Sequence, residues 1–136
     1  MRLFDLIRQA LGDRAAIPTR AAADRPAKPE PPRVPELTAA ELAAERQNGH
    51  GLLLLDCRED YEWRQGYIPG SLHIPMRQIP ERLADLDPAT DIVVVCAHGN
   101  RSYSIAGWLI ARGYRARSLR GGLADWQLRG YPTARP

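Results

Sequence analysis

The chain has 136 residues, 44% hydrophobic and 26% charged, as expected for one soluble globular domain with a short accessory segment. No apolar run approaches the roughly 20 residues of a membrane-spanning helix, and two cysteines are too few for a disulfide scaffold, which favours a reducing, cytoplasmic location. The net charge of +3 arises from residues 1–35 and the remainder is neutral without basic clusters, so nucleic-acid binding is not expected.

The first part of the chain divides into two segments. Residues 1–16 carry apolar side chains at helical spacing and predict a short amphipathic helix. Such a helix is marginal alone and needs a surface for its apolar stripe, which its own domain, a protein partner or a membrane surface could provide. Residues 17–36 are rich in Pro, Ala and Arg and predict an extended linker.

Helix and strand signals alternate over residues 37–134, which predicts one domain. Thr38 and Glu41 have the spacing of a capping box that begins a helix ending near Gln47. The apolar runs 52–55 and 92–95 predict strands buried on both faces. The other expected elements are helices near 60–64, 78–86 and 102–112, strands at 72–74 and 116–119, and a final helix that contains Trp126. The alternation predicts an α/β fold with a central parallel sheet flanked by helices on both faces.

Cys96 directly follows the apolar run 92–95 and is the main candidate for chemistry. Ligands of open parallel sheets bind beyond the carboxyl ends of the strands. A loop of Ala97, His98, Gly99, Asn100, Arg101 and Ser102 leads from Cys96 into the next predicted helix. Backbone N–H groups in such a loop, and at a helix N-terminus, favour negative charge and therefore the thiolate. The alternative interpretation of Cys96 is a small buried hydrophobic side chain.

Other residues have competing interpretations. Gly99 allows the loop to close tightly. Arg101 offers a fixed cation to an incoming anion; the alternatives are a solvated charge or a salt bridge across the loop. His98 either donates to a substrate oxyanion or lines the loop. Cys57 is expected to be packed, with a resolving thiol for Cys96 as the alternative. Two further histidines, His50 and His73, lack partners at metal-ligand spacing and are expected to be solvated or packed.

Four segments in order resemble the rhodanese family over nearly all of residues 37–133. They are Leu55–Glu59 followed by Tyr61, Gly66–Pro75, Val93–Ser102, and Gly121-Gly122 with Trp126. The resemblance implies sulfurtransferase chemistry with Cys96 as the persulfide-forming nucleophile, residues 97–102 as its cradle, and a partly structural role for Asp56 and Arg58. Two departures are Tyr67, where the family usually has His, and His73, where Asn is frequent. These departures affect local hydrogen bonding and lie outside the sulfur-bearing loop.

The implied reaction takes a sulfur atom from a small donor such as thiosulfate and passes it to cyanide or a cellular thiol by a ping-pong mechanism. It requires no metal or organic cofactor. One alternative is a non-catalytic or protein-delivery module that is recruited to a partner through its N-terminal arm, residues 1–35. The other is a phosphatase or arsenate reductase, but related enzymes of that class have Cys-x5-Arg, whereas four residues separate Cys96 from Arg101.

Overall fold

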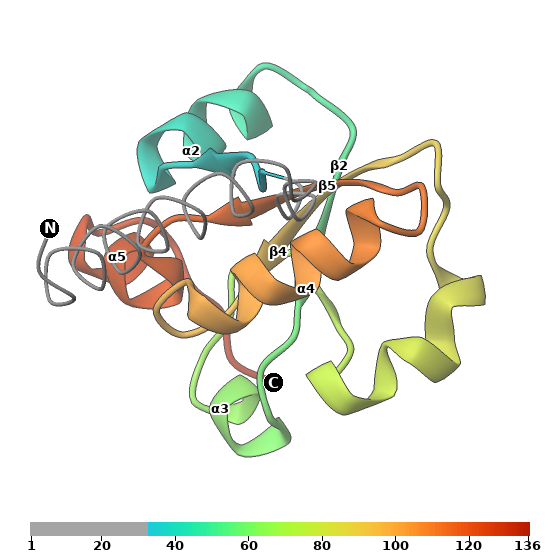
Figure 1. Cartoon of the computed structure of the whole chain (residues 1–136). Helices are drawn as coiled ribbons and strands as arrows, with labels where there is room; N and C mark the ends of the chain where they lie inside the picture. The colour runs from blue at the N-terminus through green and yellow to red at the C-terminus, as the bar shows by residue number, and fades with distance from the viewer. Residues whose placement is uncertain (1–32) are drawn as a thin grey trace, which may run out of the picture. The chain divides into compact units, whose positions relative to one another are not determined.

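The structure is a computed structural model that describes residues 33–136. The expected helix in residues 1–16, and residues 17–32 of the expected linker, lie outside the described residues. Residues 33–136 form a parallel sheet with helices on both faces (Figure 1). The predicted α/β fold is therefore confirmed.

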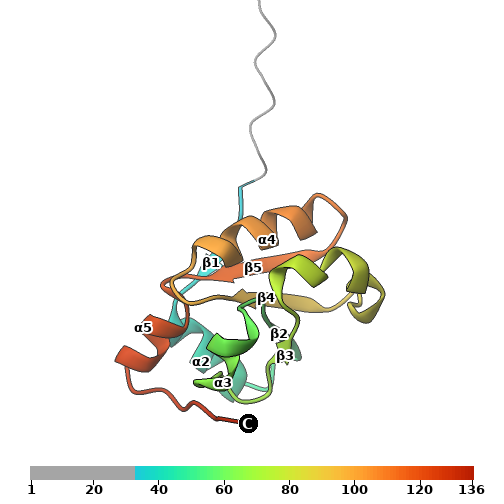
Figure 2. The same ribbon diagram turned by 90° about the horizontal axis from the view of Figure 1, so that it is seen from below.

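Five parallel strands make the sheet, in the order β1-β5-β4-β2-β3 (Figure 2). All four pairings between neighbouring strands are parallel. The strands are β1 (Glu36–Leu37), β2 (Leu52–Asp56), β3 (Leu72–His73), β4 (Asp91–Val95) and β5 (Arg115–Leu119). The sequence predicted all of these except β1, which has only two residues and begins directly after Pro35.

Helices cover both faces of the sheet. They are α2 (Ala39–Gln47), α3 (Asp60–Arg64), α4 (Asn100–Ile110) and α5 (Gly122–Leu128), with two 3-10 turns, η1 (Met76–Gln78) and η2 (Pro80–Asp85). The apolar residues of α4 and of the segment with η1 and η2 pack on one face. Those of α2 and α5 pack on the other. Both faces of the central strands are therefore buried, as the apolar runs predicted.

Successive side chains of β2 and β4 point to opposite faces of the sheet and so contribute to two separate layers of the core. Leu55 and Val94 belong to the layer under α4, whereas Leu54 and Val93 belong to the layer under α2 and α5. Full burial of such a side chain contributes roughly 1.5–3 kcal/mol. The central position of β4, between β5 and β2, follows from this burial because an edge strand would leave its apolar residues partly exposed.

Local sequence signals predicted the start of α2 correctly, but they predicted a helix at 78–86 that the structure does not contain. The capping box is present: the Thr38 side chain accepts from the Glu41 amide at 3.1 Å, and the Glu41 carboxylate accepts from the Thr38 amide at 3.2 Å. The predicted helix 78–86 was wrong, since the segment forms η1 and η2. Pro80 has no N–H to donate to the carbonyl of Met76, and the backbone of Arg82 leaves the helical region with φ −111°. Bonds of the i to i+3 type therefore replace helical ones.

None of the helices among residues 33–136 combines the length and the apolar character needed to cross a membrane.

Candidate active site

Cys96 lies at the carboxyl end of the central strand β4, as predicted from its position after the apolar run. The loop from Cys96 to Gly99 connects β4 to α4, whose first residue is Asn100. Gly99 has φ +104°, in the left-handed region that favours glycine, and an added Cβ would lie 3.2 Å from the backbone nitrogen of Gly121. The tight course of the loop therefore depends on Gly99.

Backbone amides of this loop donate to the Cys96 sulfur. The Gly99 N–H lies 3.1 Å from Sγ and the Ser102 N–H lies 3.3 Å from it. Cys96 is 1% exposed, so both donors act on Sγ away from bulk water. Two convergent N–H groups, one of them in the first turn of α4, favour negative charge on the sulfur.

Two buried serines continue this network from the sulfur into the sheet. The Ser102 Oγ lies 3.3 Å from Sγ and accepts from the thiol. It also donates to the Gly99 carbonyl at 3.1 Å and lies 2.7 Å from the Ser118 Oγ. Ser118 belongs to β5, and both serines are fully buried. The sequence interpretation included Ser102 and missed Ser118, since only the pairing of β5 with β4 brings it close.

Arg101 lies in an ion pair across the site. Its guanidinium donates to both carboxylate oxygens of Glu62, at 2.7 and 2.8 Å. The Arg101 hydrogen bonds lower the pKa of Glu62 to about 2, and the same contacts raise the pKa of Arg101 above its usual range. Among the three interpretations of Arg101, the salt bridge is the contact that the structure shows. Sequence reasoning missed Glu62, whose only local signal is its place in the short helix after Arg58.

Asp56 and Arg58 form a buried ion pair at the end of β2. The Arg58 Nε donates to the Asp56 carboxylate at 3.0 and 3.1 Å, and Nη2 donates to it at 2.8 Å. Arg58 also donates to the carbonyls of Glu62, at 3.2 Å, and Gly66, at 2.7 Å. These bonds tie the end of β2 to α3 and the segment after it. The placement is consistent with the structural role that the resemblance implies for this pair.

The first turn of α5 donates two backbone hydrogen bonds to the start of the loop that carries Cys96. The N–H of Leu123 donates to the Cys96 carbonyl at 2.9 Å, and the N–H of Ala124 donates to the Ala97 carbonyl at 3.0 Å. Gly122 has φ +61°, and a Cβ there would clash with the Cys96 carbonyl oxygen and lie 2.6 Å from that of Ala97. Only glycine allows this approach.

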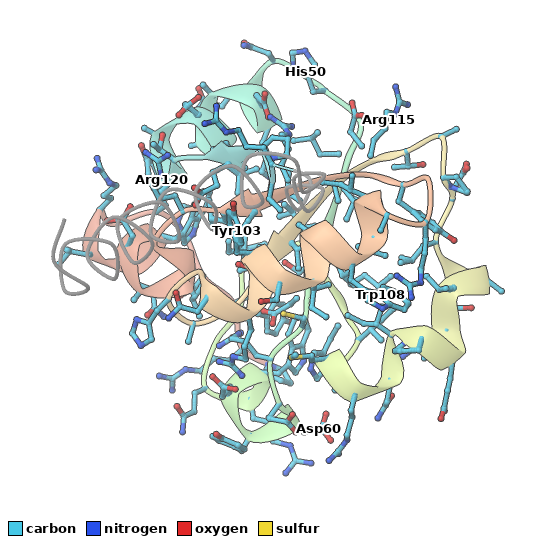
Figure 3. The ribbon with its side chains drawn as sticks, viewed as in Figure 1. His50, Asp60, Tyr103, Trp108, Arg115 and Arg120 are labelled. Atoms are coloured by element: carbon cyan, nitrogen blue, oxygen red, sulfur yellow. The ribbon has the colours of Figure 1, made fainter. Side chains whose placement is uncertain are left out.

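The remaining loop residues have no hydrogen bond to the sulfur in the structure. Ala97 and His98 line a pocket of about 260 Å³ with Arg58, Glu62 and residues of α5. Asn100 begins α4, and its carbonyl accepts from Ser104 at 3.4 Å. A larger groove of about 450 Å³ lies beside α4 at Trp108 (Figure 3), but no residue of the Cys96–Ser102 loop lines it.

The two departures from the family pattern lie together. Tyr67 stacks on Trp63 with centroids 3.7 Å apart, and His73 stacks on Trp63 with centroids 4.7 Å apart. The His73 Nε2 lies 2.7 Å from the Arg58 carbonyl. His73 is thus packed, as predicted. His50 is exposed and lies at the opposite end of the domain from Asp60, which begins α3 (Figure 3). The described residues contain no cluster that could hold a metal ion.

Cys57 is fully buried beside Cys96 in the same apolar layer. Burial, with a smaller contribution from the neighbouring Cys96, raises the pKa of its thiol to about 12. Cys57 is therefore packed in the core, as expected.

Known proteins share this sequence pattern and this fold. The rhodanese-like domain family matches residues 38–129. A sulfurtransferase of Allochromatium vinosum is 36% identical over 104 residues, which cover 76% of this chain and 97% of that protein. The thiosulfate sulfurtransferase GlpE of Pseudomonas savastanoi is 35% identical over 78 residues, 57% of this chain and 74% of that protein. A solved structure, the rhodanese-related protein of Thermoplasma volcanium, has TM-score 0.69 and 31% identity and covers 74% of this chain and 97% of that chain.

Proposed function

The chain belongs to the rhodanese-like domain family, and we propose that it is a sulfurtransferase in which Cys96 carries the transferred sulfur as a persulfide. The donor is a small sulfane compound such as thiosulfate, and the acceptor is cyanide or a cellular thiol. Relatives named as sulfurtransferases support this assignment.

The first half-reaction loads the cysteine. The Cys96 thiolate attacks the outer sulfur of thiosulfate, a new bond forms between the two sulfur atoms, and the old bond breaks with its electron pair leaving on sulfite. In the second half-reaction, cyanide attacks the outer sulfur of the persulfide and leaves as thiocyanate, while the electron pair returns to Cys96 as the thiolate. The two half-reactions together form a ping-pong cycle that restores the starting enzyme.

The observation that carries the proposal is the pair of backbone donors on the sulfur. The amide of Gly99, in the loop that follows the central strand, and the amide of Ser102, in the first turn of α4, both donate to Sγ. Donors fixed in this way favour negative charge on Sγ, which is the attacking atom in the first half-reaction and the leaving atom when the acceptor attacks. A cysteine that served only for packing would need no such donors.

The contacts of Arg101 favour sulfur transfer over phosphate-ester hydrolysis or arsenate reduction. A phosphatase loop must present its arginine to a tetrahedral oxyanion. Here the Arg101 guanidinium is engaged by both carboxylate oxygens of Glu62, at 2.7 and 2.8 Å. The loop is also one residue shorter than Cys-x5-Arg. We assign Arg101 to fixing the start of α4, and with it the Ser102 amide.

Steady-state kinetics with thiosulfate and cyanide test the proposal. We expect parallel double-reciprocal plots, the pattern of a ping-pong mechanism, and loss of turnover in Cys96→Ser with an unchanged melting temperature. Cys57→Ala, which removes the other thiol of the chain, is the matched control and should still turn over. Turnover of an aryl phosphate in place of thiosulfate would contradict the proposal.

A further inference from the structure

Cys57 and Cys96 occupy equivalent positions on neighbouring strands. Asp56 of β2 pairs in register with Val95 of β4, and each cysteine is the next residue. The Cys57 N–H donates to the Val95 carbonyl at 3.0 Å, so the ladder continues to the cysteines. Adjacent strands lie about 4.8 Å apart, within the range of about 4.4–6.8 Å over which Cα atoms of disulfides are separated.

The two side chains also point to the same face of the sheet. Leu55 and Cys57 on one strand, and Val94 and Cys96 on the other, all belong to the apolar layer under α4. Cys57 is 0% exposed and Cys96 is 1% exposed. Cys57 therefore approaches Cys96 from the sheet, whereas the amides of Gly99 and Ser102 belong to the loop and to α4.

We propose that Cys57 is a resolving thiol that discharges the Cys96 persulfide when no acceptor is present. This step rests on the proposed function. The Cys57 sulfur attacks the inner sulfur, Cys96 Sγ, and forms a disulfide with it. The bond between Sγ and the outer sulfur breaks, and its electron pair leaves with the outer sulfur. That sulfur takes a proton from water to become hydrosulfide, which balances the proton that Cys57 released to solvent when it ionised. The persulfide is the oxidant, and no other is needed.

The environment of Cys57 makes this discharge slow. The thiolate is the attacking form, and the Cys57 pKa of about 12 leaves only roughly one molecule in 10⁵ ionised at pH 7. An acceptor in solution therefore competes successfully for the persulfide. Discharge dominates only when acceptors run out, and it leaves Cys96 protected as a disulfide that an external dithiol can reopen.

The experiment follows the fate of the Cys96 persulfide after a single treatment of the full-length chain with thiosulfate. Reduced protein is treated with thiosulfate, desalted, and kept without oxygen or acceptor while intact mass and free hydrosulfide are measured over time. Wild type should first gain one sulfur atom and then reach a mass two hydrogens below the reduced protein, with one hydrosulfide released per disulfide. The rate should rise about tenfold per pH unit between pH 7 and 9, and should not depend on protein concentration, since the step is intramolecular.

Cys57→Ala and Cys57→Val are the matched variants, one smaller and one larger than the native side chain. Both should take up sulfur and keep it at least tenfold longer than wild type. If the Cys96 persulfide lasted equally long in wild type and in a folded Cys57 variant, the proposed role of Cys57 would be overturned, while the transfer reaction would be unaffected. A wild type that never gains sulfur would overturn both proposals.

Discussion

Glu62 and Arg101, 39 residues apart in the sequence, form a bidentate ion pair that joins α3 to the start of α4. The contact links two segments at the carboxyl edge of the sheet, one after β2 and one after β4. Arg58 donates to the Glu62 carbonyl, so the buried Asp56–Arg58 pair supports the same connection. The loop that carries Cys96 is thus held by ionic contacts on one side and by the buried serines on the other.

Glu62→Gln should lower stability in a pH-dependent way. The Glu62 pKa is about 2 in the folded protein, against an ordinary value of 4.5, so its contribution is complete above pH 4.5 and is lost as the pH falls toward 2. We expect the free energy of unfolding to fall by roughly 1–2 kcal/mol at pH 7, and this difference between variant and wild type should shrink below pH 4.5. Urea unfolding of both proteins at pH 7, 5, 4 and 3 measures the difference. Asp85→Asn, which breaks the exposed Arg82–Asp85 pair, is the control and should change little.

Arg58→Lys should destabilise the domain although it keeps the charge. A lysine cannot reproduce the fork that donates to Asp56 and to the carbonyls of Glu62 and Gly66. We expect a loss of about 3 kcal/mol, since the buried Asp56 carboxylate loses most of its donors. Arg129→Lys, at an exposed pair, should cost under about 0.5 kcal/mol. Chemical unfolding of both variants gives the comparison, and equal losses would contradict the assigned role of Arg58.

Ser102→Ala should slow transfer more than Ser118→Ala does. Once Cys96 has lost its proton, the Ser102 hydroxyl can turn from the Gly99 carbonyl to donate to Sγ, and Ser118 can donate to Ser102 in turn. Loss of one donor to a charged sulfur predicts roughly a tenfold fall in kcat/KM for Ser102→Ala. Ser118→Ala should show a smaller fall. The rate of iodoacetamide alkylation of Cys96 at pH 7 should fall in the same order, and unchanged rates would contradict a role for the serines.

Gly122→Ala should abolish most transfer activity by displacing the loop. The added Cβ would overlap the Cys96 carbonyl and lie 2.6 Å from that of Ala97. Gly49 is the matched control, because it also has positive φ, +74°, but a Cβ added there would have no atom within 4 Å. In both variants the left-handed backbone costs about 1 kcal/mol. Only Gly122→Ala should lose turnover, and equal kinetics in the two variants would show that α5 does not hold the loop.

The sequence was sufficient for the fold because its signals are local and repeated. Apolar runs of four residues predicted β2 and β4, and the Thr38–Glu41 capping box predicted the start of α2. The helix predicted at 78–86 was wrong because the missing N–H of Pro80 interrupts helical hydrogen bonding in this segment. β1 is too short to produce a periodic pattern.

The candidate site was only partly predictable from the sequence. Cys96 and its loop form one continuous segment, and their position after a buried strand is a local signal. Glu62 and Ser118 reach the loop from α3 and β5, and only the packing of those elements reveals them. The neighbouring positions of Cys57 and Cys96 likewise depend on the pairing of β2 with β4, which neither strand's own sequence specifies.

The role of Cys96 as the sulfur carrier is tested most directly by the intact mass of the reduced protein before thiosulfate, immediately after it, and again after cyanide. We predict that wild type gains one sulfur atom and then loses it with release of thiocyanate, and that Cys96→Ser does neither. A sulfur adduct of the same size in Cys96→Ser, or no adduct in a folded wild type, would contradict the assignment of Cys96 as the sulfur carrier.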